Sequence, residues 1–236
     1  MRVRRVVSTR AGGRSVGRFA HFNLSGGVGD EPAAVAANRA RVERELGVPA
    51  VFLAQVHGTR VATIDALPAA GAPDVAGTDA AVTALPGVAL AVLAADCVPV
   101  LLADPRAGVV GVAHAGRVGA AAGVVPATVA AMVALGGRVD SIEVLLGPAI
   151  CGSCYEVPAA MRAEVDAALP GSAVATRKRT PGLDLRAGLY HQLTALGVAK
   201  IGADPRCTLE SADLYSHRGN GPTGRQAAFT WLDPRR

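Results

Sequence analysis

The sequence predicts an α/β fold: a single domain of three layers (α/β/α), with helices on both faces of a mixed β-sheet. Half of the residues are apolar but only 3% are aromatic, so Ala, Val and Leu must build the core. Apolar runs of strand length alternate with Ala-rich stretches of helical period. Turn signals such as "DPRAG" join several strands, which favours hairpins and therefore a mixed sheet. No repeat or linker divides residues 1–236, so we expect one domain.

The N-terminal part predicts one strand, one helix and a pair of short strands. Residues 2–9 alternate between polar and apolar side chains, as a half-buried strand does. Apolar residues at helical spacing predict a helix over residues 32–46, with a proline in its first turn. Two further runs, at 51–56 and 59–66, predict strands that flank His57, which we expect at the turn between them.

The rest of the chain predicts more strands and three more helices. The expected strands cover residues 88–94, 98–104, 108–114, 141–148 and 226–232. The expected helices cover residues 117–135, 158–168 and 184–196. Small residues dominate the first of these segments, which predicts an Ala-rich helix.

Charge and composition argue against a nucleic-acid partner. The net charge of +5 comes mainly from scattered arginines, with one short basic run at residues 177–179, whereas nucleic-acid binders concentrate charge on one face. Eight aromatic residues are too few for a base-stacking platform. The positive balance instead suits a small anionic substrate such as phosphate.

The apolar patterning argues against a membrane partner and against secretion. The longest apolar run, residues 88–102, is interrupted by Asp96 and Pro99 and is too short to span a bilayer. The N-terminus is basic but lacks the apolar stretch of a signal peptide. We therefore expect a cytoplasmic protein whose four cysteines are thiols or ligands rather than disulfides. Nothing in the sequence indicates the oligomeric state.

His57, Cys97 and His114 form the best candidate site. Each lies at the end of an apolar strand beside a small or turn-forming residue, where a rigid scaffold presents side chains into a cleft. Two imidazoles and one thiolate suit zinc and leave a fourth position open for water or substrate. The alternative is three unrelated structural residues, because their separations match no zinc-finger or ribbon pattern. Spacing alone leaves both interpretations open.

Five motifs follow one another along the chain: "QVHGTRV", "DAAVTALPGVALAVLAADCVPVLLADP", "VGVAHAGRVG", "LGPAICGSCYEV" and "YSHRGNGPTGRQAAF". Their order and spacing resemble the YfiH/YlmD family, and so do "TRAGG", "FNLSGGVGDEP" and "NRARV" near the N-terminus. The resemblance covers nearly the whole chain and implies a YfiH-like fold. Members of the family have been called laccase-domain proteins, peptidoglycan editing factors and purine nucleoside phosphorylases.

The resemblance implies a zinc-dependent enzyme that acts on purine nucleosides. The family's metal ligands are the histidine of QVHG, the cysteine of DC-x-P and the histidine of HAG, which here are His57, Cys97 and His114. The implied reaction is phosphorolysis of adenosine, inosine or methylthioadenosine to the free base and a pentose 1-phosphate. Deamination of adenosine is the second implied activity.

These reactions need groups that hold phosphate and groups that assist proton transfer. Arginine forks match phosphate oxygens, although a single arginine is also common at a surface. We expect Asp96 and Arg117 to act in catalysis, with orientation of its own loop as the alternative role of Asp96. The residues expected to bind phosphate or substrate are Arg10, Asn23, Arg218 and Arg225.

Two stretches depart from the family pattern. Relatives usually read HAGWRG where this chain reads "HAGRVG", so Arg117 stands at the tryptophan position and Val118 at the arginine position. Gly219 in "SHRGNGPTGR" stands where a second arginine is frequent. These changes bear on substrate specificity and rate more than on metal binding.

Cys151 and Cys154 form a C-x-x-C pair, which is typical of redox and zinc sites. The sequence has no second pair of this kind and no thioredoxin-like context around it. A redox or zinc role is therefore disfavoured. The resemblance to the YfiH/YlmD family implies instead a loop near the active site, with Tyr155 and Glu156 shaping the pocket.

Three other functions stay open. A copper-dependent polyphenol oxidase is disfavoured, because five histidines are few for several copper ions and no methionine lies near the ligands. A hydrolase with Cys97 as nucleophile and His114 as base would suit editing of peptidoglycan precursors. A non-enzymatic, zinc-stabilised binding protein would unfold when its metal is removed.

Overall fold

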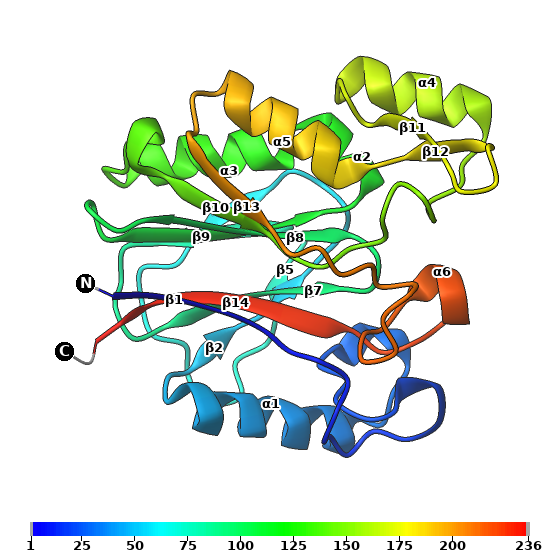
Figure 1. Cartoon of the computed structure of the whole chain (residues 1–236). Helices are drawn as coiled ribbons and strands as arrows, with labels where there is room; N and C mark the ends of the chain where they lie inside the picture. Colours follow the sequence, from blue (N-terminus) through cyan, green and yellow to red (C-terminus); the bar gives the residue numbers. More distant parts are fainter. Residues whose placement is uncertain (1, 235–236) are drawn as a thin grey trace.

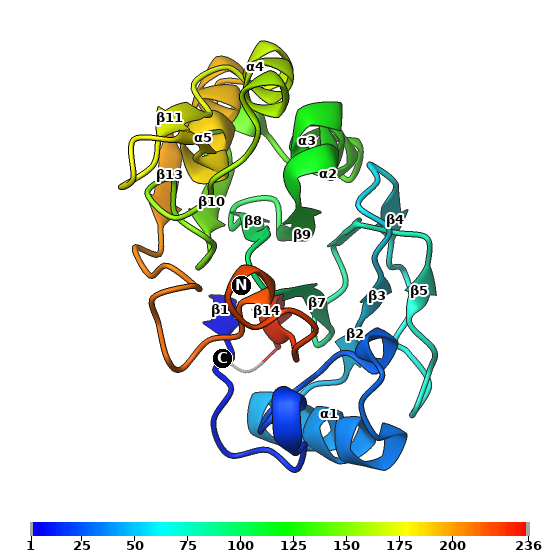
Figure 2. The same ribbon diagram turned by 90° about the vertical axis from the view of Figure 1, so that its right-hand side faces the viewer.

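Most of the strands form two stacked sheets with helices on the outer side of each (Figure 1). This computed structural model describes residues 2–234. A layer of helices, a six-stranded sheet, a four-stranded sheet and the helix α1 (Pro32–Leu46) follow one another, and the perpendicular view shows the same stacking (Figure 2). No helix in the described range is long and apolar enough to cross a membrane.

Each large sheet mixes parallel and antiparallel pairs. The four-stranded sheet, in the order β1-β14-β7-β2, consists of β1 (Arg2–Val7), β2 (Ala50–Val51), β7 (Ala89–Ala94) and β14 (Gln226–Asp233). The six-stranded sheet, in the order β13-β10-β8-β9-β6-β4, consists of β4 (Val61–Thr63), β6 (Ala80–Thr83), β8 (Val98–Asp104), β9 (Val109–Ala115), β10 (Glu143–Leu146) and β13 (Lys200–Ala203). Two smaller sheets pair β3 (Leu53–Ala54) with β5 (Val75–Ala76) and β11 (Ala173–Ala175) with β12 (Pro181–Leu183).

Most of the remaining helices cover the outer face of the six-stranded sheet (Figure 1). They are α2 (Arg117–Ala122), α3 (Val124–Ala134), α4 (Ala159–Ala168) and α5 (Leu185–Ala195), and the short α6 (His217–Asn220) precedes β14. The expected single helix over 117–135 is therefore wrong. Gly123 divides it into α2 and α3 by adopting φ 93°, a left-handed conformation that glycine accepts without steric cost.

Side chains of β8 alternate between two apolar cores. Val98, Val100 and Leu102 pack on the side of the helices, whereas Leu101 and Ala103 pack between the two sheets. Because both faces of this sheet are covered, the strand is apolar at successive positions instead of every second one. A third core lies between the four-stranded sheet and α1.

The structure confirms the mixed α/β class and refines its layering. Strands expected in one sheet are divided between two sheets, so the layers number four instead of three. The sequence does not distinguish the two arrangements. A strand covered by helices on both faces and a strand covered by helices on one face and a second sheet on the other are both continuously apolar, as β7 and β8 are. The expected strand over 51–56 is also shorter, because it is interrupted at Phe52 between β2 and β3.

Candidate metal centre and active site

His57, Cys97 and His114 converge on one point, which we call the His–Cys–His centre. Their ligand atoms all lie within 4.8 Å of one another. The Cys97 Sγ is 3.8 Å from His57 Nε2, and the two imidazole rings meet edge to face with centroids 4.7 Å apart. His57 is exposed, Cys97 is half-buried and His114 is buried. The centre therefore has a protected inner side and an open outer side.

Strand register brings Cys97 beside His114. Cys97 lies in the connection from β7 to β8, and β8 pairs antiparallel with β9 so that Pro99 is opposite His114. His57 enters from the loop between β3 and β4, where it adopts φ 62°. A Cβ on Gly116 would lie 2.7 Å from His57 Cδ2 and 3.1 Å from Cys97 Sγ. Only glycine at position 116 allows this approach.

Asp79, just before β6, holds the centre from behind. Its Oδ1 contacts His114 Nδ1 at 2.9 Å and accepts a 2.9 Å hydrogen bond from the His57 backbone N–H. Its Oδ2 accepts hydrogen bonds from the backbone N–H groups of Val56 and Gly58, at 3.0 and 2.8 Å. One buried carboxylate thus fixes the loop that carries His57 and orients the His114 ring, as carboxylates hydrogen-bonded to metal-binding histidines do.

The electrostatics of the centre favour an ionised thiol. Burial alone would raise the pKa of Cys97, but the charges and hydrogen bonds of His114 and His57 lower it to about 6. Burial alone would lower the pKa of His114, but Cys97 and Asp79 raise it to about 9. Burial would likewise raise the pKa of Asp79, and hydrogen bonds from His114 and the Gly58 and Val56 amides reverse the direction. A thiolate is both a metal ligand and a nucleophile.

The donor set fits a transition metal that accepts nitrogen and sulfur ligands. Asp79 occupies Nδ1 of His114, so Nε2 is the nitrogen left for a cation. Two imidazoles and one thiolate match catalytic zinc sites, which keep a fourth position open. The centre and a second group, described below, are the candidate metal-binding groups among residues 2–234.

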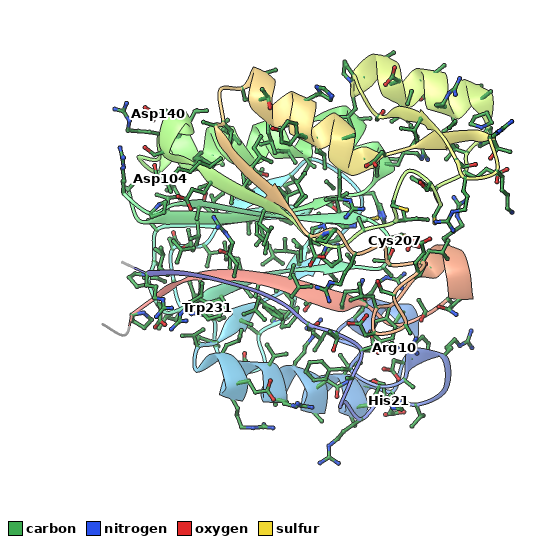
Figure 3. The ribbon with its side chains drawn as sticks, in the orientation of Figure 1. Arg10, His21, Asp104, Asp140, Cys207 and Trp231 are labelled. Carbon is green, nitrogen blue, oxygen red and sulfur yellow. The ribbon has the colours of Figure 1, made fainter. Side chains whose placement is uncertain are left out.

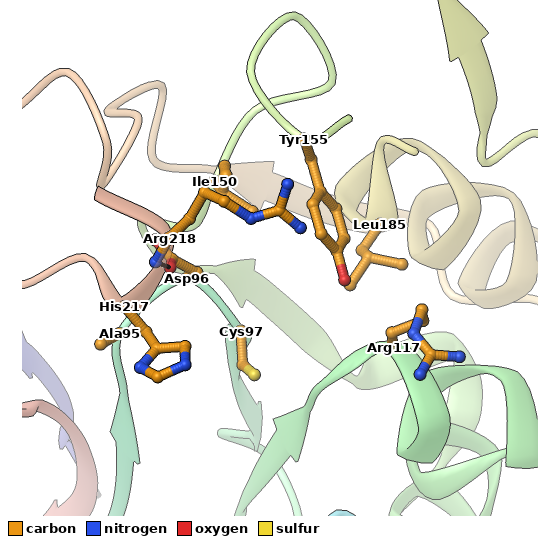
Figure 4. Close-up of a pocket in the computed structure, with 9 residues that line it drawn as sticks. All are labelled: Ala95, Asp96, Cys97, Arg117, Ile150, Tyr155, Leu185, His217 and Arg218. Carbon is orange, nitrogen blue, oxygen red and sulfur yellow. Dashed lines mark hydrogen bonds between the residues drawn. The ribbon is translucent and has the colours of Figure 1, made fainter. Parts of the chain in front are cut away.

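Two cavities meet at Cys97 and His217. The larger one, of about 620 Å³, contains the His–Cys–His centre and Arg225 in its lining, and we call it the metal-side cavity. The smaller one, of about 150 Å³, is lined by Asp96, Cys97, Tyr155 and others, and we call it the arginine cavity because Arg117 and Arg218 face it (Figure 4). His217 is a candidate site residue that the sequence did not single out.

Three of the predicted arginines line these cavities. Arg117 begins α2, and Arg218 lies in α6 with its guanidinium over the Tyr155 ring, 5.0 Å from the ring centroid. Arg218 Nη1 also donates to the Glu156 carbonyl at 2.8 Å. The remaining N–H groups of a guanidinium are enough for an anion, since it carries five. Val118, at the family's arginine position, is 49% exposed, whereas Arg117 reaches the cavity.

Both carboxylate oxygens of Asp96 accept hydrogen bonds from other segments of the chain. Its Oδ1 accepts hydrogen bonds from Thr208 Oγ1 at 2.6 Å and Ser216 Oγ at 2.7 Å, and its Oδ2 accepts one from the Arg218 backbone N–H at 2.6 Å. Asp96 lines the arginine cavity, but its contacts position α6. This arrangement matches the alternative role of orienting a loop more closely than proton transfer.

Arg10 and Asn23 line neither cavity. Arg10 donates twice to the Ala20 carbonyl and lies over the Tyr215 ring. Asn23 is fully buried, and its Oδ1 accepts the Arg225 backbone N–H at 2.9 Å. Asn23 thus supports the segment that brings Arg225 to the metal-side cavity. Both residues lie in the scaffold of the site.

Asp79 and His217 are the residues that sequence reasoning missed. Asp79 is the first residue of a motif already quoted for its resemblance, but an acidic residue before a short apolar strand has no spacing relation that ties it to the ligands. His217 stands between Ser216 and Arg218 in a stretch already quoted for its resemblance. The quoted motif around His217 was the signal that could have identified it as a site residue.

Comparison with known proteins points to one family. Residues 4–233 match the family model described as multi-copper polyphenol oxidoreductase laccase. The chain is 53% identical over 236 residues to the purine nucleoside phosphorylase of Mycobacterium tuberculosis, covering 99% of this chain and 93% of the relative. It is 54% identical over 227 residues to a purine nucleoside phosphorylase of Streptomyces griseus, covering 95% and 92% of the two chains.

Solved structures agree with this assignment. YlmD from Geobacillus stearothermophilus superimposes with a TM-score of 0.88 at 34% identity, covering 98% of this chain and 92% of that one. YfiH from Bacillus licheniformis gives a TM-score of 0.89 at 29% identity with the same coverage. The resemblance covers both sheets and all the segments that carry the site.

Proposed function

The chain belongs to the YfiH/YlmD family of laccase-domain proteins, and from this premise we propose that it is a zinc-dependent purine nucleoside phosphorylase. The observation that carries the proposal is the 52–54% identity, over nearly the whole chain, to relatives that bear this name. Adenosine, inosine and methylthioadenosine are the substrates we propose, with phosphate as the second substrate.

The two cavities suit two substrates. The metal-side cavity has room for a nucleoside, and the arginine cavity offers the guanidinium groups of Arg117 and Arg218 to phosphate. Because the cavities share Cys97 and His217, the sugar carbon and a phosphate oxygen would meet between them. A phosphate oxygen then forms a bond to that carbon while the bond to the purine nitrogen breaks. The bonding electrons leave with the purine.

The leaving purine needs a proton, and His217 is placed to supply it from the border of the two cavities. Asp96 positions this step through its hydrogen bonds to Ser216 and the Arg218 backbone. His57, Cys97 and His114 would hold the zinc ion, with Asp79 orienting His114. When bound, zinc supplies positive charge beside the reacting groups.

A second reaction, deamination of adenosine, is proposed for the same centre. It replaces the amino group of the purine ring with an oxygen from water and releases ammonia. The observation that favours it is the open outer side of the His–Cys–His centre, which faces the larger cavity.

The centre does not suit a copper-dependent oxidase. Only two of the five histidines lie in this centre, and two are too few to bind several copper ions.

Nucleoside incubations with and without phosphate test the proposal. The wild-type protein with adenosine and phosphate is expected to release adenine and pentose 1-phosphate, separable by chromatography. Inosine formed without phosphate reports deamination. His114→Ala should abolish both products, whereas His191→Ala, an exposed histidine on α5, should release base at the wild-type rate. Absence of base release by the wild type, or equal release by His114→Ala, contradicts the proposal.

A further inference from the structure

We propose that Cys151, Cys154, Cys207 and Glu210 form a second metal site, which binds a zinc-type divalent cation and stabilises one wall of the active site. These residues, called the three-cysteine cluster below, place their ligand atoms within 4.8 Å of one another. Three sulfurs and one carboxylate oxygen make four donors, the number in closed structural zinc sites. Thiolates select zinc over magnesium or calcium.

Two segments far apart in the sequence supply the cluster. Cys151 and Cys154 follow β10, and Cys207 and Glu210 follow β13. Because β10 and β13 are parallel neighbours, both segments leave the sheet at the same edge. A parallel bridge between Ala149 and Cys207 continues the pairing beyond the strands. Figure 3 shows Cys207 in the long connection between β13 and α6.

The backbone around the thiols is arranged as metal-binding turns require. The Cys154 and Tyr155 N–H groups both donate to the Cys151 carbonyl, at 2.9 and 3.0 Å, which turns the C-x-x-C segment back on itself. The Cys151 N–H donates to Cys207 Sγ at 3.3 Å. These backbone contacts hold the three sulfurs close to one another.

An arginine beside the cluster compensates part of its charge. Arg177 forms an ion pair with the Glu210 carboxylate, which has a second oxygen for a cation. Three thiolates and a carboxylate would leave a dication with excess negative charge, and Arg177 offsets part of it. The four donors and this arginine together suit one divalent cation.

The cluster also explains how the active-site wall is held. Its first segment continues into Tyr155, which lines the arginine cavity, and into Glu156, whose carbonyl accepts Arg218 Nη1. Its second segment contains Thr208, which donates to Asp96. A cation that joins the two segments would fix both sides of the arginine cavity. The predicted loop near the site is thus also a ligand-bearing loop.

Zinc content tests the inference directly and needs no nucleoside. Protein purified under reducing conditions is expected to contain two zinc ions per chain by elemental mass spectrometry. Cys151→Ser with Cys154→Ser should contain one, and His57→Ala with His114→Ala should also contain one, from the other site. Ser153→Ala, within the same turn, is the matched control and should keep two. Wild-type zinc content in the Cys151/Cys154 double variant would overturn the inference.

Cobalt substitution gives a second measurement that does not depend on the double variant being folded. Sulfur-to-cobalt absorption in Cys97→Ser should remain at about three quarters of the wild-type intensity, because three of four thiolate ligands remain. Loss of this absorption in Cys97→Ser would overturn the inference. So would an intact mass of the purified wild type that shows a disulfide within the three-cysteine cluster.

Discussion

The His–Cys–His centre and the three-cysteine cluster both adjoin the arginine cavity, the first through Cys97 and the second through the neighbouring Tyr155, yet their surroundings differ. The first has three donors, borders both cavities and is backed by a buried carboxylate. The second has four donors and contributes Tyr155, not a ligand atom, to the arginine cavity. Donor number and access to a cavity, more than the presence of cysteine, therefore separate a site for chemistry from a site for stability.

The largest expected effect is a contrast between two cysteine variants, one in each group: the first should lose activity and the second should lose stability. Cys97→Ser removes a ligand of the His–Cys–His centre, and phosphorolysis should fall more than about 100-fold, beyond what second-shell changes cost. Its thermal midpoint should change little. Cys207→Ser should lower the thermal midpoint by several degrees and reduce phosphorolysis much less than Cys97→Ser does, because Cys207 lines neither cavity. Steady-state kinetics and calorimetry on both variants check the contrast, and a large rate loss in Cys207→Ser alone would reverse it.

Asp79→Asn tests the carboxylate that distinguishes the first centre. The neutral amide loses the charge that orients His114 and one acceptor for the loop amides, so metal affinity should fall by about 10- to 100-fold. Buried amides left without partners should also cost about 1–3 kcal/mol of unfolding free energy. Zinc titration and urea unfolding measure the two effects. Asp65→Asn, at an exposed loop position, should change neither.

Gly116→Ala tests whether close packing limits the centre. The added Cβ would meet His57 Cδ2 at 2.7 Å, so overpacking should cost about 1–3 kcal/mol and shift the His57 ring. Gly26→Ala is the matched control, because nothing lies within 4 Å of a Cβ built there. Thermal unfolding compares the two variants. Equal midpoints would contradict the prediction, because the loop carrying His57 would then have shifted without a loss of stability.

The smallest effect concerns thiol reactivity in metal-free protein. At about pH 7.5 a thiol with a pKa of about 6 is more than about 90% thiolate, so Cys97 should react first with iodoacetamide. The pKa of Cys154 moves in the opposite direction, which keeps that thiol protonated and slow. Peptide mass spectrometry over time gives the order of modification. Faster labelling of Cys154 would contradict the assigned electrostatics.

Local patterns predicted the elements that depend on local interactions. The helix over 32–46 has the bounds of α1, because a proline start and helical spacing act within the segment itself. The division of the strands between two sheets was not predictable in this way. It depends on which apolar face covers which, and β7 and β8 are apolar on both faces.

In the site, too, local patterns predicted some residues and not those whose role depends on contacts across the fold. His57, Cys97 and His114 were found because strand ends and family motifs mark them, and the structure brings them together. The role of Asp79 depends on four contacts across the fold, and none of them leaves a spacing signal. A metal role for the C-x-x-C pair was disfavoured because the sequence has no second pair, and the Cys207 and Glu210 that lie beside it are more than 50 residues further along the chain.

The connection from β7 to β8 passes from the four-stranded sheet to the six-stranded sheet, and Cys97 lies on it. His114 belongs to the six-stranded sheet alone. The distance between these two ligands nevertheless depends on the pairing of β8 with β9 inside the six-stranded sheet. A coloured ion such as cobalt, bound there, would report on that pairing during unfolding. Its spectrum would persist if the two sheets parted while the six-stranded sheet kept its own hydrogen bonds.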